Sequence, residues 1–508
     1  MAGEPAGLPA RAHGLALLDR STLARLPARL RPSLAPSALS VGIVHLGAGA
    51  FHRAHLVVYT ERAAELAGEE RWGLLSASQR SPRAAELLRA QDCLYSVRAV
   101  APGRCSIKVL ASLREALFAG EAPERVVGRI AEGAVSLVTL TVTEKGYRHD
   151  PATGHLARKD PELLADALGR PPRTVLGQLA RGLEARRRAG TGPVAVCSCD
   201  NLVGNGALLR RLVSELVALA PGGFDAGLDG WIRENVTFPS SVVDRIVPAA
   251  TPADVEESAA LLGVEDRAAV VAEPFSQWVI EDDFLAPRPR WELAGAELVT
   301  DVSAHEELKL RVLNGSHSSL AYLGALAGLG TVAEAAGEPR LEAFVRRLVL
   351  EEVAPTLSLP PGVELAGYLD AVLERFANPA LRYTCLQVAS DGSLKLGPRL
   401  LGTVRDRLAQ GAEPRRAALV VAAWAIALAR GVDDLGRPLV VLDPLAARVA
   451  ELLGSPGSAG ASAARLLGLL EVFGEDLGED DRFRRLLADG LEALSAAPAL
   501  EVAALAAG

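Results

Sequence analysis

The sequence predicts an α/β protein in which a doubly wound parallel sheet precedes a mainly α-helical region. Short apolar runs alternate with helical stretches up to about residue 300. Strands that alternate with helices usually pair in parallel through right-handed crossovers. From about Val302 onward, long segments rich in Ala, Leu and Arg replace the short runs. A chain of 508 residues also exceeds one ordinary hydrophobic core, so we expect more than one domain.

The sheet region begins with the clearest strand. Residues 40–47 form an apolar and β-branched run that ends in glycine, and residues 54–67 follow with helical periodicity. Further strands are predicted at 72–77, 106–111, 135–143 and 193–198. A long helical stretch is predicted at 161–188. Residues 1–38, rich in Ala, Pro and Arg, are expected to be a lead-in segment, so the sheet domain is predicted over 39–300.

The second half reads as helices. They are predicted at 338–352, 415–430, 444–453 and 481–497. Each combines strong helix formers with helical spacing of apolar residues. Residues 301–508 are therefore predicted to form a mainly α-helical domain.

Composition limits the possible partners. With 49% apolar and 23% charged residues the chain should pack as a soluble globule. A net charge of −8 with scattered arginines offers no basic face, which argues against nucleic acid and anionic membranes. No apolar run reaches the roughly 18–20 residues that span a bilayer. The five cysteines include only a C-x-C pair, so we expect reduced thiols, a cytoplasmic location and no metal site.

A glycine turn follows the first predicted strand. It comprises Gly47, Ala48, Gly49, Ala50, Phe51 and His52. Two glycines of this spacing let the backbone turn sharply and approach a pyrophosphate at a helix N-terminus. His52 stands where the dinucleotide fingerprint has its third glycine. A bare Gly-x-Gly is often only a loop, but the strand before it and the helix after it favour a Rossmann-type dinucleotide-binding domain.

The segment after the second strand bears on the choice of cofactor. In NAD-binding units an acidic residue there usually holds the adenosine ribose. Residues 78–83 contain no acid but include Arg80 and Arg83. These arginines can accept a 2′-phosphate or can simply be solvated surface charges. NAD is the expected cofactor, and NADP stays open.

Lys309 is the most informative side chain in the helical half. The chain has 54 basic residues, but only five are lysines. A buried lysine can lose its proton near neutral pH, whereas arginine cannot. On an α-helix with about 100° per residue, Glu306, Lys309, Asn314 and His317 would share an arc of roughly 140°. The alternative is a solvated helix face, which the apolar residues among them disfavour.

These residue types suit chemistry at a secondary alcohol. Such chemistry needs a base for the hydroxyl proton, donors for the oxygen and a cofactor that exchanges hydride. Lys309 can be the base and Asn314 a donor. A second amide can come from Asn201 or Asn205, just past a predicted strand's carboxyl end, where open α/β sheets bind ligands.

Six segments in order give the chain a family resemblance. They read GAGAFHRAH at 47–55, TVTEKGY at 141–147, SCDN at 198–201, FPSSVVDRI at 238–246, EPFSQWVIE at 273–281 and KLRVLNGSH at 309–317. Together they resemble the polyol-specific long-chain dehydrogenase family, which includes mannitol 2-dehydrogenase and fructuronate reductase (mannonate oxidoreductase). The resemblance covers about residues 40–400.

The resemblance implies a metal-independent NAD(P)-dependent oxidoreductase whose active site lies between the two domains. It would interconvert a secondary alcohol of a sugar alcohol or hexonate and the matching ketose or keto-uronate. The implied roles are general acid/base for Lys309, oxyanion donors for Asn205 and Asn314, substrate positioning for His317, substrate contacts for Asp244 and Lys395, and a proton path for Glu306. Glu144 and Lys145, which end a predicted strand, are expected near the cofactor.

Two other enzyme classes and one non-enzyme role are the alternatives. A short-chain reductase is disfavoured because Tyr147 has no lysine four residues on, and a zinc alcohol dehydrogenase lacks metal ligands. A catalytically silent NAD(H)-sensing regulator on the same scaffold is the non-enzyme alternative. Gln387 stands where some polyol enzymes carry arginine, so the substrate is not decided. The resemblance favours a monomer or small homo-oligomer.

Overall fold

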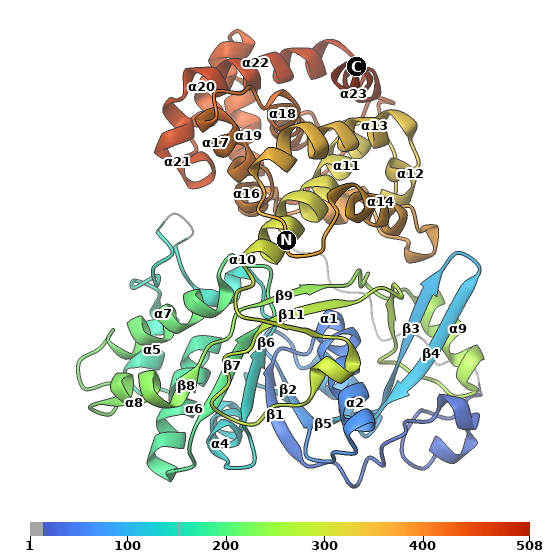
Figure 1. The fold of residues 1–508 in the computed structure, drawn as a ribbon, viewed down its shortest axis with the longest axis vertical. Helices are drawn as coiled ribbons and strands as arrows, with labels where there is room; N and C mark the ends of the chain where they lie inside the picture. Colours follow the sequence, from blue (N-terminus) through green and yellow to red (C-terminus); the bar gives the residue numbers. More distant parts are fainter. Residues whose placement is uncertain (1–13, 151–152) are drawn as a thin grey trace. The chain divides into compact units, whose positions relative to one another are not determined.

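The computed structural model describes residues 14–150 and 153–508. The chain divides into two compact units, Met1–Val302 and Ser303–Gly508, each of which is described by itself (Figure 1). Within the described residues, no helix combines the length and the apolar character that crossing a membrane requires.

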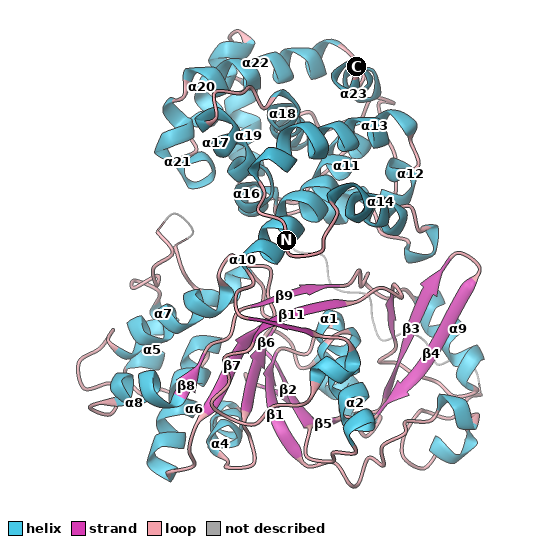
Figure 2. Ribbon diagram, in the orientation of Figure 1, coloured by secondary structure: helices cyan, strands magenta, loops and turns pink. Residues whose placement is uncertain are grey.

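The first unit is built on a six-stranded sheet. Its strands, in spatial order, are β5 (Leu113–Phe118), β2 (Gly73–Ser78), β1 (Val41–Leu46), β6 (Leu137–Leu140), β7 (Val194–Ser198) and β8 (Val236–Thr237). Every neighbouring pair is parallel. Counted in order of entry this is 3-2-1-4-5-6, the doubly wound order of dinucleotide-binding domains. The predicted doubly wound sheet is therefore confirmed (Figure 2).

Helices cover both faces of this sheet, which explains why its strands are almost continuously apolar. Val44 and Leu46 of β1 join a core with α4 (Pro123–Ala131), α6 (Val175–Ala189) and α7 (Asn205–Val217). Ile43, the residue before Val44, joins the opposite core with α2 (Leu56–Ala67) and α3 (Arg83–Ala90). The alternation follows from the two-residue period of a strand.

Two smaller sheets complete the unit. One contains β3 (Tyr95–Ala101), β4 (Arg104–Leu110) and β10 (Val270–Ala272), and the other contains β9 (Ser241–Asp244), β11 (Gln277–Glu281) and β12 (Glu297–Val299). The strand predicted at 106–111 is β4, which pairs antiparallel with β3 and lies outside the six-stranded sheet. The third strand to enter that sheet is β5, whose Arg114 and Glu115 masked it in the sequence.

The helix predicted at 161–188 is interrupted. It forms α5 (Pro161–Ala167) and α6, separated by a turn that contains Pro171 and Pro172. Proline removes a backbone donor and disfavours a helical conformation in the residue before it.

The described part of the predicted lead-in packs against the first unit. Leu18, Leu26 and Leu30 are buried in a cluster with Val109 and Val264.

The second unit is mainly helical, as predicted. Its chain begins with α10 (Ser303–Leu308), a π-helix labelled η5 (Lys309–Asn314) and α11 (Gly315–Leu326). Its further helices are α12 (Val332–Ala336), α13 (Pro339–Arg347), the π-helix η6 (Leu348–Val353), α14 (Leu365–Phe376), α15 (Cys385–Ala389), α16 (Gly392–Leu396), the π-helix η9 (Gly397–Leu401), α17 (Gly402–Ala409), α18 (Arg415–Ala429), α19 (Ala446–Gly454), α20 (Ala459–Leu467), α21 (Leu470–Glu479), α22 (Asp481–Ala496) and α23 (Ala499–Ala507). All of α11 and most of α18 are buried, so these two helices form the centre of the unit.

Candidate functional site

The turn after β1 contains two glycines with different roles. Gly47 has a φ of +134°, and a Cβ added there would lie 2.6 Å from the carbonyl oxygen of Thr141. Its N–H donates to the carbonyl of Ala77 at 2.8 Å, so the turn is held between the ends of β2 and β6. Gly49 is exposed, and a Cβ there would meet no atom within 4 Å. Gly47 therefore permits close backbone packing, and Gly49 leaves space where phosphates can approach.

The remaining residues of the turn lead into the first helices. Ala48 is buried, Ala50 begins α1 (Ala50–Ala54), and Phe51 stacks on His55 with ring centroids 4.9 Å apart. The predicted helix at 54–67 thus corresponds to α2 preceded by the short α1.

His52 is fully buried beneath the turn. Its ring stacks on that of His45 with centroids 3.5 Å apart, and its Nε2 lies 2.7 Å from Oγ of Ser76. The two ring nitrogens of His45 lie 2.9 and 2.8 Å from the hydroxyls of Thr139 and Thr141. Burial lowers the pKa of His45 to about 3 and holds the pKa of His52 well below its usual value, with repulsion from His45 as the next cause. The His52 side chain supports the turn from the interior, and its contact with a cofactor stays a prediction.

The loop after β6 is held in an unusual conformation. Thr143 has φ +64° and ψ 165°, a region that is essentially restricted to glycine. Asp200 accepts hydrogen bonds from the backbone N–H groups of Val142 and Thr143 at 3.0 Å and from the Tyr147 hydroxyl at 2.9 Å. Burial raises the pKa of Asp200 to about 6. The strained Thr143, held by the half-buried Asp200, makes this loop a candidate functional segment.

Glu144 and Lys145, the two predicted cofactor residues of this loop, lie in its 3-10 turn, where Glu144 is half-buried and Lys145 is exposed. Sequence reasoning missed Asp200 as the residue that holds the loop, although it lay in a quoted motif at a strand end. Asp200 follows β7, whereas its hydrogen-bond partners lie in the loop after β6, and a single sequence does not reveal contacts between these two loops.

Asn205 links two segments of the first unit. Its Nδ2 donates to the carbonyls of Asp200 at 3.0 Å and Ser241 at 2.8 Å, and its Oδ1 accepts from the N–H of Ser241 at 3.0 Å. Both amide hydrogens are therefore used by backbone carbonyls. The other candidate amide, Asn201, is exposed. Asp244 ends β9 and is 6% exposed.

Lys309 and Asn314 are the first and last residues of the π-helix η5. In a π-helix the hydrogen bonds join residues five apart rather than four, so each residue turns through a smaller angle than in an α-helix. The sequence predicts Lys309 and Asn314 on an α-helix with about 100° per residue. In the π-helix the angle between these two side chains about the helix axis is smaller than that spacing gives. Single π turns inside α-helices are frequent at functional sites.

The side chains of this turn are buried. Lys309 is 5% exposed, Asn314 7% and His317 8%, while Glu306 is half-buried. Among the residues that the structure describes, Oδ1 of Asn314 and Nε2 of His317 have no hydrogen-bond partner. A buried polar atom without a partner costs free energy, so these two neighbouring atoms are candidates for contact with a polar ligand.

Packing fixes the His317 ring. It stacks on Phe376 with centroids 4.5 Å apart and lies 5.5 Å from the Tyr383 ring. Burial, together with the smaller effect of the positive charges of Arg399, Lys395 and Arg375, lowers the pKa of His317 to about 3. The imidazole is therefore neutral near pH 7, and one of its nitrogens can donate a hydrogen bond while the other accepts one.

The π-helix η9 packs closely against this turn. A Cβ added to Gly315 would lie 2.9 Å from the carbonyl oxygen of Arg399 in η9. The Arg399 guanidinium also donates to Oγ of Ser318 at 3.0 Å. Lys395, in the preceding helix α16, donates to the carbonyl of Ser390 at 2.5 Å and is half-buried. Gly315 is thus the residue that lets the two π-helices meet.

The described residues contain no group of three or more His, Cys, Asp or Glu side chains placed to hold a metal ion.

Comparison with known proteins gives consistent matches over both units. The family model for the mannitol dehydrogenase Rossmann domain matches residues 41–293, and that for the mannitol dehydrogenase C-terminal domain matches residues 301–495. The D-mannonate oxidoreductase of Escherichia coli (strain K12) is 41% identical over 459 residues, which cover 89% of this chain and 93% of that protein. The mannitol 2-dehydrogenase of Pyrenophora tritici-repentis is 37% identical over 466 residues, which cover 90% of this chain and 80% of that protein.

A solved structure matches as well. The ternary complex of Pseudomonas fluorescens mannitol 2-dehydrogenase with NAD and D-mannitol superposes with a TM-score of 0.89 at 33% identity. The match covers 96% of this chain and 98% of that one.

Proposed function

Because this chain belongs to the mannitol dehydrogenase family of oxidoreductases, we propose that it is a metal-independent, NAD(P)-dependent polyol or hexonate dehydrogenase. Its reaction interconverts a secondary alcohol of a sugar alcohol or hexonate and the matching ketose or keto-uronate. The observation that carries the proposal is the buried π-helical turn. Lys309 and Asn314 stand at its two ends, and His317 follows Asn314 in the next helix.

The first unit fits a dinucleotide. Its strand order, the open space at Gly49 and the backbone turn at Gly47 are the features that dinucleotide-binding domains use for a pyrophosphate. When bound, the nicotinamide group accepts the hydride from the alcohol carbon or returns it to the ketone. Glu144 and Lys145, on the loop that Asp200 holds, stay predicted cofactor contacts.

Lys309 is the general base for alcohol oxidation. Burial favours the neutral amine over the ammonium ion, so its Nζ can accept the hydroxyl proton as the C–H bond yields hydride. In ketone reduction the protonated amine returns that proton to the oxygen. After alcohol oxidation the Lys309 ammonium releases its proton to solvent, and half-buried Glu306 is the proposed relay.

Asn314 and His317 hold the reacting molecule. The Asn314 amide can donate to the developing alkoxide or the carbonyl oxygen, and it does not compete for the proton. The neutral ring of His317, fixed against Phe376, orients a substrate hydroxyl.

Roles for Asp244, Lys395 and Asn205 remain predictions. The predicted oxyanion role of Asn205 requires one of its two backbone acceptors to give way to the substrate oxygen. In the described structure its bonds support a positioning role between the β7 loop and β9.

The decisive assay follows nicotinamide absorbance with a panel of ketoses and keto-uronates. Purified protein with NADH should reduce at least one compound of the fructose or fructuronate type, with and without a chelator. Binding of NAD(H) without turnover of any compound would instead identify a catalytically silent sensor. Loss of turnover on chelation would contradict the metal-independent mechanism.

A further inference from the structure

A cationic cavity lies beside the carboxyl ends of β2 and β6. Its volume is about 350 Å³, within the range of roughly 300–1,000 Å³ found for small-ligand pockets. Its lining includes Gln79, Arg80, Lys145, Arg148, Arg173 and Thr174. Among the described residues, no Asp or Glu lines it. The cavity is therefore suited to an anion.

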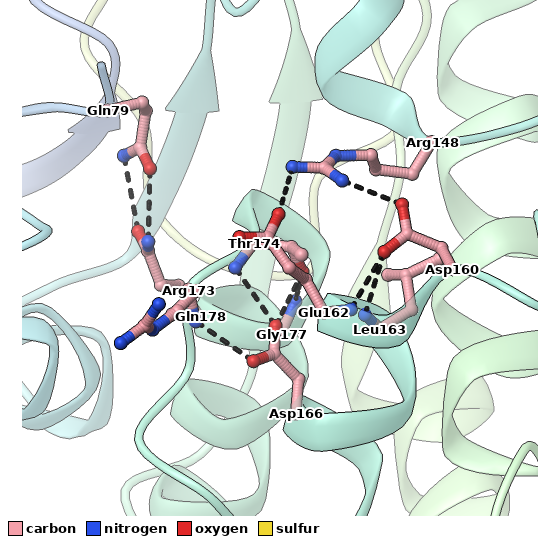
Figure 3. Close-up of polar contacts among 10 residues, drawn as sticks. All are labelled: Gln79, Arg148, Asp160, Glu162, Leu163, Asp166, Arg173, Thr174, Gly177 and Gln178. Carbon is pink, nitrogen blue, oxygen red and sulfur yellow. Dashed lines mark hydrogen bonds and ion pairs between the residues drawn. The ribbon is translucent and has the colours of Figure 1, made fainter.

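Two of its three arginines have no carboxylate partner among the described residues. Arg148 pairs with Asp160 at 2.6 Å and with Glu162, so its charge is balanced (Figure 3). Within the part of the chain that the structure describes, Arg80 donates only to the hydroxyl of Thr143, at 3.2 Å. The Arg173 guanidinium has no partner among residues 14–150 and 153–508, and Figure 3 shows it pointing away from the Arg148 ion pairs. Arg80 and Arg173 thus bring two unpaired charges to one cavity.

The backbone around Arg173 is fixed. Asp166 accepts hydrogen bonds from the N–H groups of Arg173 and Thr174, each at 2.9 Å, and from the Thr174 hydroxyl at 2.7 Å (Figure 3). A rigid backbone at this point reduces the ordering cost when the guanidinium binds a ligand.

The position of Arg80 relates the cavity to a dinucleotide. Arg80 follows β2 by two residues, at the site where an acidic side chain binds the ribose 2′-hydroxyl of NAD and an arginine accommodates the 2′-phosphate of NADP. Residues 79–83 include no acid. Gln79 cannot replace it, since its amide is paired reciprocally with Gln178 at 3.2 and 3.0 Å and also donates to the carbonyl of Ala77.

We propose that this cavity binds a phosphomonoester, the 2′-phosphate of NADP(H), through Arg80 and Arg173. Guanidinium groups bind phosphate oxygens in a forked geometry that lysine cannot reproduce. The protein then binds NADP(H) more tightly than NAD(H) while accepting both. This inference rests on the proposed function, which it deepens by naming the preferred form of the cofactor.

The test uses non-redox fragments of the cofactor, so it does not depend on turnover. Calorimetry of the full-length protein with 2′,5′-ADP and with 5′-AMP compares ligands that differ in the 2′-phosphate. We expect 2′,5′-ADP to bind roughly 10- to 100-fold more tightly, as charge-assisted hydrogen bonds to a phosphate predict. Arg80→Gln and Arg173→Gln should each reduce this ratio about tenfold. Arg170→Gln, at an exposed arginine outside the cavity lining, is the matched control and should leave the ratio unchanged.

Equal affinities for the two nucleotides would overturn the proposal. The proposal would also fail if Arg80→Gln and Arg173→Gln weakened the binding of 2′,5′-ADP and 5′-AMP equally. Titration with inorganic phosphate distinguishes a separate anion site: phosphate binding without any advantage of 2′,5′-ADP over 5′-AMP also refutes it. NADH-dependent turnover of the unmodified protein in that case means that only this inference fails. Absence of turnover with either NADH or NADPH means that the proposed function fails.

Discussion

At the scale of single residues, two glycines two positions apart should respond differently to the same substitution. Gly47→Ala places a Cβ 2.6 Å from the Thr141 carbonyl at a φ of +134°, so a loss of several kcal/mol in unfolding free energy is expected, as for backbone strain plus overpacking. Gly49→Ala meets no atom within 4 Å and should fold with nearly unchanged stability. Its nucleotide affinity should nevertheless fall, because the added methyl occupies the space proposed for the pyrophosphate.

Urea unfolding and nucleotide calorimetry of both variants separate the two effects. A Gly49→Ala protein that binds nucleotide as tightly as the unmodified chain would show that the phosphates lie elsewhere. A Gly47→Ala protein of full stability would contradict the packing role of Gly47.

Part of the site could be predicted from residue types alone. The glycines after a strand, the rare Lys309 and its neighbouring Asn314 and His317 are recognisable because each carries a chemical property that few other residues share. The burial of His52 could not be predicted, since it depends on stacking with His45 and a bond to Ser76 from another strand. The strained Thr143 and its support by Asp200 likewise arise from contacts between distant segments.

At the scale of elements, the contact between η5 and η9 should be sensitive at one glycine and tolerant at another. Gly315→Ala brings a Cβ to 2.9 Å from the Arg399 carbonyl, so the two π-helices must move apart. We expect a loss of about 1–3 kcal/mol in stability and a lower kcat/KM, because the Lys309 turn is displaced.

The matched control is Gly397→Ala in η9, where a Cβ meets no atom within 4 Å. It should be neutral or slightly stabilising, since Ala favours helices over Gly by up to about 1 kcal/mol. Thermal unfolding and steady-state kinetics of both proteins provide the comparison. Equal behaviour of the two variants would mean that the close contact at Gly315 does not hold the turn in place.

Elements were predictable to the extent that their patterns are local. The strands β1, β2, β6 and β7 are apolar on both faces and stand out in the sequence. The strand β5 carries charged residues and was missed, while β4 was found but belongs to another sheet, because pairing partners are decided by tertiary contacts. The π-helical turns were also missed, since hydrophobic periodicity cannot show a single wider turn.

At the scale of the whole molecule, buried histidines and buried carboxyls change the stability of the fold in opposite directions as the pH falls. His45, His52 and His317 are held neutral by burial. Between their usual pKa of 6.5 and the lowered one, the unfolded chain binds more protons than the folded chain, so stability is lost as the pH falls. Burial raises the pKa of Glu61, Asp200, Asp266 and Glu352, and these carboxyls act in the opposite direction.

Comparing the His45→Gln variant with the unmodified protein isolates the contribution of His45. His45→Gln should lower the unfolding free energy of the first unit near pH 7.5. Near pH 5 this difference from the unmodified protein should be smaller by about 2 kcal/mol, because there the unmodified protein loses the free energy that protonation of His45 gives its unfolded chain. Urea titrations at the two pH values measure this change. A constant deficit for His45→Gln would contradict the neutral, buried assignment.

The central claim for the whole enzyme is that Lys309 carries the proton. It is tested most directly by the turnover of Lys309→Ala, with Lys159→Ala at an exposed lysine as control. We predict a loss of about 100- to 10,000-fold for Lys309→Ala with nucleotide affinity retained, partial recovery on addition of a small primary amine, and normal turnover for the control. A Lys309→Ala enzyme that turns over its ketose at nearly the unmodified rate would contradict the account.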